Sequence, residues 1–262
     1  AKFPKLEAVG CKVGIGVATG ADKAFIGDFE ALDVEPSRKL PLVMTGDIRT
    51  GEIQWQGKGV INPFDDDNEL VRLEEYPRMA QYLEERRDVI AGRRVATKAP
   101  ANWYRTIDRI HPEITAREKL LIPDIKGDAV IVYEPGGLYP HHNIYFITSN
   151  IWDIRALQTV LKSGIARLFV SLYSIKMRGG SLRFQSQYLR RICLPSWETV
   201  SDELRTTLRI LSETDNREAR NAAVAELYGL SSADMQLIEG PNAPPLRRKS
   251  TSLQGKKSVH TE

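Results

Sequence analysis

The sequence is poor in the residues that build metal centres and disulfide frameworks. Its 262 residues include two cysteines, Cys11 and Cys193, and four histidines. Neither cysteine lies in a CxxC motif, so no zinc-finger spacing is present, and both are predicted to be small buried residues in a reducing compartment. No signal peptide is found, and no apolar run approaches the roughly 20 residues of a membrane span. We therefore expect a soluble, cytoplasmic protein.

Motifs of several enzyme classes are also missing. The sequence contains no Walker loop and no G-x-S-x-G elbow. Gly14, Gly16 and Gly20 have the wrong last spacing for a dinucleotide-binding loop. Asp124 and Lys126 match the D-x-K part of metal-dependent nucleases, but the other acidic ligands have no recognisable placement. The lack of a convincing catalytic constellation favours a recognition module.

Two loop segments carry aromatic or imidazole rings. Trp103 is predicted mainly as a core residue because of its large apolar area, and a platform for a sugar or base, with Arg105 beside it, is the minority interpretation. His141 and His142 are predicted to be loop residues rather than ligands, because successive side chains on a strand point to opposite faces.

Positive charge is clustered rather than general. The tail from Pro241 to Glu262 holds five basic residues and one acidic residue, so it accounts for the formal net charge of +3. The stretch from Arg155 to Arg191 holds eight basic residues and no acidic residue. Within it, Gly179 and Gly180 break a predicted helix and are flanked by Lys176, Arg178 and Arg183. Such a turn lets guanidinium groups approach an anion, for which a nucleic-acid backbone is the obvious candidate; a solvated basic face is the alternative.

Short apolar runs separated by Gly, Pro and Asp turns predict a mainly antiparallel β region, followed by helices. The expected strands lie at about 13–17, 24–26, 40–44, 57–61, 119–125, 129–133 and 144–148. The glycines in the strand at 13–17 predict that it lies in close contact with another backbone. Helices are expected after Tyr76, at about 153–163, from 165 to 175, and at about 200–211 and 215–228, the last capped by Asp215. We predict an α+β fold with a DNA target-recognition domain at 1–195, a helical segment at 196–240 and a disordered basic tail at 241–262.

Four segments, in order, resemble the C-terminal target-recognition region of TaqI-like N6-adenine DNA methyltransferases of restriction–modification systems. They are Val13–Ile26 (VGIGVATGADKAFI), Leu40–Ile48 (LPLVMTGDI), Tyr139–Tyr145 (YPHHNIY) and Lys176–Gln185 (KMRGGSLRFQ) leading to Leu194-Pro195.

The resemblance implies a domain that clamps duplex DNA against a catalytic domain, which flips the target adenine out of the stack. In the family, the catalytic half binds S-adenosylmethionine and holds the adenine with an Asn-Pro-Pro-Tyr motif. This sequence has neither element; Asn62-Pro63-Phe64 lacks the second proline. The chain alone is therefore expected to be inactive as a methyltransferase, and its expected partners are double-stranded DNA and a catalytic domain.

By position, the resemblance also suggests residues near DNA. The predicted contacts are Thr19, Asp22, Lys23, Thr45, Asp47, Arg49, Trp103, Arg105, His141, His142, Lys176, Arg178 and Arg183. No catalytic and no metal-binding residue is predicted. Because the chain starts at Ala1 rather than Met, a processed, cloned or excised piece is expected. The alternatives are a stand-alone DNA specificity subunit, a nuclease using Asp124 and Lys126, and a scaffold with a merely solvated basic stretch.

Overall fold

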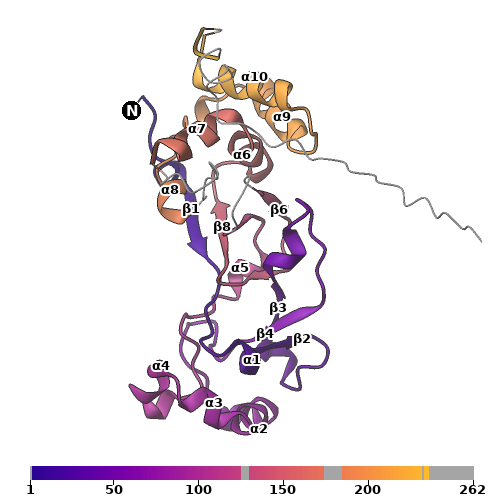
Figure 1. Ribbon diagram of the computed structural model, residues 1–262, viewed down its shortest axis with the longest axis vertical. Helices are drawn as coiled ribbons and strands as arrows, with labels where there is room; N and C mark the ends of the chain where they lie inside the picture. Colours follow the sequence, from indigo (N-terminus) through magenta and orange to yellow (C-terminus); the bar gives the residue numbers. More distant parts are fainter. Residues whose placement is uncertain (1, 125–129, 174–184, 232, 236–262) are drawn as a thin grey trace, which may run out of the picture.

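The computed structural model has two β-sheets, one above the other, with helices at both ends of the molecule (Figure 1). It describes residues 2–124, 130–173, 185–231 and 233–235. The predicted α+β class, mainly antiparallel with packed helices, is confirmed. Lys176, Arg178 and Arg183, Lys126 of the D-x-K motif and the tail at 241–262 lie outside the described residues.

The first sheet is antiparallel throughout and has the order β1-β8-β5-β6. Its strands are β1 (Cys11–Ile15), β8 (Ile144–Ser149), β5 (Lys119–Pro123) and β6 (Val132–Glu134). Because β8 and β5 lie in the middle with both faces covered, they read as continuous apolar runs rather than alternating patterns. The strands β1 and β8 are thus paired although more than 120 residues separate them in the sequence.

Helices cover one face of this sheet and share its core. They are α6 (Ile154–Leu161), α7 (Gly164–Tyr173), α8 (Ser186–Leu189), α9 (Asp202–Leu211) and α10 (Arg217–Tyr228). Buried residues of α9 and α10 belong to the same hydrophobic cluster as Val13 and Leu120 of the sheet. The predicted boundary at residue 195 stays a prediction, although this core runs across it.

Side chains at the starts of three of these helices accept hydrogen bonds from amides of the first turn. Asp153 and Ser201 accept hydrogen bonds from the third backbone N–H beyond them, at 2.9 and 3.3 Å. The prediction that Asp215 caps the last long helix is wrong by one residue, because the Asn216 side chain accepts the bond from Ala219 at 3.0 Å. Both residue types suit the position, and only the backbone conformation decides between them.

The second sheet has the order β2-β4-β3-β7 and is smaller. Its strands are β2 (Ile26–Asp28), β4 (Lys58–Ile61), β3 (Lys39–Val43) and β7 (Tyr139–Pro140). The β3–β7 pair is parallel, whereas the other described pairs of strands are antiparallel. The strand predicted at 24–26 is corrected: a helical turn, α1 (Asp22–Phe25), comes first, and β2 begins only at Ile26. Phe25 is fully buried, so its apolar character reflects the core and not a strand.

Short helices close the lower end of the molecule (Figure 1). They are α2 (Pro77–Glu84), α3 (Arg87–Ala91) and α4 (Arg94–Thr97), while α5 (Glu113–Ala116) precedes β5. Isolated 3-10 turns lie at Leu6–Val9, Pro36–Arg38, Thr45–Ile48, Leu73–Glu75, Pro100–Asn102 and Trp197–Thr199. As predicted, α2 starts after Tyr76 and buries Met79 and Leu83. No helix in the described ranges combines the length and apolar surface needed to cross a membrane.

The two sheets are held together by an apolar layer and by close backbone approach. Val43 and Ile48 of the second sheet region pack on Leu121, Val132 and Phe146 of the first.

The end of β1 lies at this junction between the two sheets. A Cβ atom on Gly16 would lie 2.2 Å from the Pro140 carbonyl oxygen and 2.3 Å from that of His141. The prediction that this glycine-rich strand lies against another backbone is therefore confirmed.

Candidate functional site

Two loops that the sequence places 119 residues apart meet beside this junction. The first loop begins at Thr19, whose buried hydroxyl donates a 2.5 Å hydrogen bond to Asp22 Oδ1 and accepts one from the Ala21 amide at 3.0 Å. These bonds fix the turn that starts α1. They also hold the Asp22 carboxylate so that its second oxygen points to His141, 3.2 Å from Nε2.

The second loop carries the two histidines directly after β7. The His141 amide donates to the Val43 carbonyl and the His142 amide to the Val17 carbonyl, both at 3.1 Å. The Ile144 amide then donates to the His141 carbonyl at 2.8 Å, which closes a turn. Because this segment turns, the two imidazole rings lie on the same side, with centroids 4.0 Å apart.

This geometry corrects the argument that adjacent histidines must diverge. The alternation of side chains holds only for a regular strand, and β7 ends at Pro140. Donor atoms of Asp22, His141 and His142 lie within 4.8 Å of one another. These side chains form what we call the Asp-His-His cluster.

Burial and hydrogen bonding shift the acidity of this cluster. Burial lowers the pKa of His141 below its ordinary value, and the hydrogen bond to Asp22 offsets part of this effect. Burial alone would raise the pKa of the Asp22 carboxyl, but the hydrogen bonds from Thr19 and His141 outweigh it, so the pKa is lowered. Around neutral pH, Asp22 is therefore ionised and His141 is neutral.

The other predicted contact residues are more scattered. Thr45, Asp47 and Arg49 lie in and after the turn that follows β3. Asp47 is buried, and its carboxylate accepts a 2.8 Å hydrogen bond from the Met44 amide, so it stabilises the turn from within. Arg49 is exposed, as is Lys23 beside the Asp-His-His cluster.

Trp103 is only 7% exposed and packs in the core with Phe25 and Met79. The Arg87 guanidinium lies 4.7 Å from the centre of its ring. Burial thus favours the predicted core role over a stacking platform. Its neighbour Arg105 is partly exposed.

Arg93 is a residue that sequence reasoning missed. Its guanidinium donates to the carbonyls of Thr19, Trp103 and Arg105 at 2.6, 3.0 and 2.7 Å. It therefore ties the loop of the Asp-His-His cluster to the helical lower end of the molecule. No local signal marks it, because one arginine among 37 basic residues has no distinguishing sequence context.

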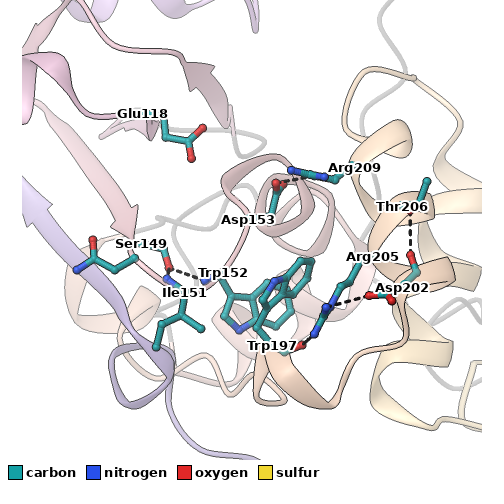
Figure 2. Close-up of a pocket in the computed structure, with 11 residues that line it drawn as sticks. Glu118, Ser149, Ile151, Trp152, Asp153, Trp197, Asp202, Arg205, Thr206 and Arg209 are labelled. Carbon is teal, nitrogen blue, oxygen red and sulfur yellow. Dashed lines mark hydrogen bonds and ion pairs between the residues drawn. The ribbon is translucent and has the colours of Figure 1, made fainter.

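Two surface cavities border the first sheet. The larger, of about 580 Å³, lies where β8 ends and α9 passes (Figure 2). Its arginines are already paired: Arg209 contacts Asp153 at 2.6 Å, and Arg205 contacts Asp202 at 3.0 Å and the Trp197 carbonyl at 2.8 Å. This pairing favours a role in attaching α9. The smaller cavity, of about 360 Å³, lies beside β1 and includes Lys12, Asp108, Arg109, Glu113 and Arg117.

Comparisons of sequence place these features in a protein class. The chain is 64% identical over 238 residues to Type II methyltransferase M.PaeR7I of Pseudomonas aeruginosa, a match that covers 91% of this chain and 42% of that protein. It is 59% identical over 236 residues to M.XhoI of Xanthomonas vasicola and 44% identical over 240 residues to M.BstVI of Geobacillus stearothermophilus. The matches cover 43% of each of those proteins, so the chain is homologous to part of type II methyltransferases. No family model matches.

Solved structures share the fold. The chain aligns with the Type IIL restriction–modification enzyme MmeI, solved in complex with DNA, with a TM-score of 0.58 and 10% sequence identity. The match covers 84% of this chain and 33% of MmeI. The type IIG restriction endonuclease BpuSI aligns with a TM-score of 0.52 and 14% identity, over 90% of this chain and 30% of BpuSI. At these identities the likeness establishes a shared architecture.

Proposed function

We propose that this chain is the DNA target-recognition region of an N6-adenine-specific methyltransferase of a restriction–modification system. A catalytic domain outside this chain binds S-adenosylmethionine and transfers the methyl group. The chain holds the duplex and selects the site at which the adenine is flipped.

One observation carries this proposal. Of this chain, 91% matches type II methyltransferase M.PaeR7I, yet the match spans only 42% of that protein. The sequence also lacks the Asn-Pro-Pro-Tyr motif that adenine-specific enzymes of the resembled family use to hold the flipped base. A division of labour, with recognition here and chemistry elsewhere, accounts for both facts.

The shared architecture supports the same assignment. MmeI, whose fold resembles this chain, was solved in complex with DNA. Within this chain, the exposed Lys23 lies in α1 and the exposed Arg49 follows the turn Thr45–Ile48. The resemblance expects contacts at both places, and their cationic groups suit phosphates. Thr19 and Asp47, whose side chains are buried, stabilise these two segments from within.

Direct DNA binding tests the proposal. The purified chain is titrated with fluorescent duplex over a salt series from about 50 to 200 mM, with transfer from labelled S-adenosylmethionine measured in parallel. We expect affinity to fall linearly on a log–log plot, by about 0.9 per phosphate contact, without methyl transfer. Binding without salt dependence, or methyl transfer by this chain alone, would contradict the assignment.

A further inference from the structure

Three side chains of the Asp-His-His cluster have the donor set of a transition-metal site. Two imidazoles and one carboxylate place nitrogen and oxygen atoms within 4.8 Å of one another. Imidazole nitrogen suits zinc, copper, iron and nickel, and a carboxylate oxygen completes many such sites. The cluster is assembled from two loops, so it forms only in the folded protein.

We propose that Asp22, His141 and His142 bind a divalent first-row transition-metal ion such as Zn²⁺, with water in the remaining coordination position. The proposed ligand atoms are Asp22 Oδ2 and His141 Nε2, which already face each other, and the unpaired Nδ1 of His142. The ion links the loop after β1 to the turn after β7.

The spacing of the first two ligands fits an ion between them. Asp22 Oδ2 and His141 Nε2 are 3.2 Å apart. Two ligands bound tetrahedrally to zinc at about 2.0–2.1 Å lie roughly 3.3–3.4 Å from each other. Replacing the hydrogen bond by a shared ion therefore requires little movement of either side chain.

His142, the third proposed ligand, has a feature that the Asp22–His141 hydrogen bond does not explain. His142 Nδ1 is buried and has no hydrogen-bond partner among the residues that the structure describes. A buried nitrogen without a partner costs free energy, and such a group calls for an explanation. The Asp22–His141 hydrogen bond pairs one atom of each of those side chains but leaves the Nδ1 atom of His142 without a partner in the described part of the chain. A bound ion accounts for all three.

The surroundings resemble the support that metal ligands receive in proteins. The Thr19 hydroxyl donates to Asp22 Oδ1, so the other carboxylate oxygen is directed to the cluster. The amides of His141 and His142 are anchored on the Val43 and Val17 carbonyls. The His141 side chain is 5% exposed and the Asp22 side chain is 45% exposed. The site is therefore buried at His141 and open to solvent at Asp22, where an ion and its water can enter.

Metal titration tests the site in the absence of DNA, so its outcome is independent of the proposed recognition function. A chain without a polyhistidine tag is stripped with a chelator and titrated with Co²⁺, whose visible absorption reports low-symmetry nitrogen and oxygen coordination. Zn²⁺ is then added as a competitor. We expect one Co²⁺ per chain and displacement of its absorption by Zn²⁺.

Variants identify the ligands. His142→Ala and Asp22→Asn are each expected to weaken binding by at least about tenfold, whereas the other two histidines serve as controls. His111→Ala and His260→Ala should bind as the wild type does. His142→Gln is a second variant, and circular dichroism confirms that each variant is folded. The proposal is overturned if the wild type binds no ion, or if folded His142→Ala and His142→Gln bind it as tightly as the wild type.

Discussion

Gly16 lies where the end of β1 touches the backbone of Pro140 and His141. A methyl group here would meet two carbonyl oxygens at 2.2 and 2.3 Å, and backbone yields less readily than a flexible side chain. We predict that Gly16→Ala lowers the free energy of unfolding by about 1–3 kcal/mol, measured by urea denaturation. Gly46→Ala, with its nearest neighbour at 3.9 Å, is the matched control and should change stability by less than about 0.5 kcal/mol.

Cys11 gives the protein a predictable response to alkali. Burial raises the pKa of its thiol from 9.0 to about 11, although a hydrogen bond with Ser149 lowers it somewhat. A raised acid pKa stabilises the fold fully below the unfolded value, and this stability is lost as pH rises from about 9 towards 11. The unfolding free energy of the wild type should therefore fall over this range more steeply than that of Cys11→Val. Parallel curves for the two proteins would refute this account.

At the residue scale, the sequence named Asp22, His141 and His142 separately but did not predict that they lie together. Asp22, His141 and His142 were each selected by resemblance, but their convergence required knowing that the chain turns after Pro140. The role of Arg93 could not be predicted from the sequence, because its hydrogen-bond partners are backbone carbonyls of distant residues. Carbonyl acceptors carry no sequence signature.

Strands β5 and β6 share a buried ion pair. The Lys119 ammonium contacts the Glu134 carboxylate, and the two side chains are 0% and 2% exposed. Lys119 also donates to the Arg117 carbonyl at 2.8 Å. Burial lowers the pKa of Lys119, and the pairing with Glu134 partly restores it.

Removing the Lys119 ammonium should leave the Glu134 carboxylate buried without a partner for its charge. We predict that Lys119→Met lowers the free energy of unfolding by about 3–5 kcal/mol. The double variant Lys119→Met, Glu134→Leu should lie closer to the wild type than Lys119→Met alone, because no uncompensated charge remains. Additive losses in this double-mutant cycle would mean that the two side chains are not coupled.

Element prediction succeeded where the signal is local. Turn residues placed the strands β3, β4, β5 and β8. The helices α6 and α9 lie within the ranges predicted at 153–163 and 200–211. The short α1 was missed because four residues offer too little periodicity, and its apolar pair also fits a strand. The parallel β3–β7 pairing was missed because it joins segments about 100 residues apart.

At the scale of the whole molecule, the basic stretch around Gly179 is the strongest sequence-based candidate for phosphate contact. We predict that Arg178→Ala with Arg183→Ala weakens duplex binding and reduces the salt slope by about one unit per lost contact. Arg72→Ala with Arg78→Ala is the matched control, since both arginines are exposed and paired with acids. An unchanged slope in the first variant would remove Arg178 and Arg183 from the interface.

The measurement that tests the central claim most directly is a graft into a relative. The 238-residue matching region of M.PaeR7I is replaced by this chain, and methylated bases in DNA are mapped by sequencing and mass spectrometry. We predict N6-methyladenine at one defined sequence with the graft, and no site-specific methylation by the M.PaeR7I remainder without it. Site-specific methylation by that remainder alone, at the same sequence and a similar rate, would contradict the claim that this region recognises the target.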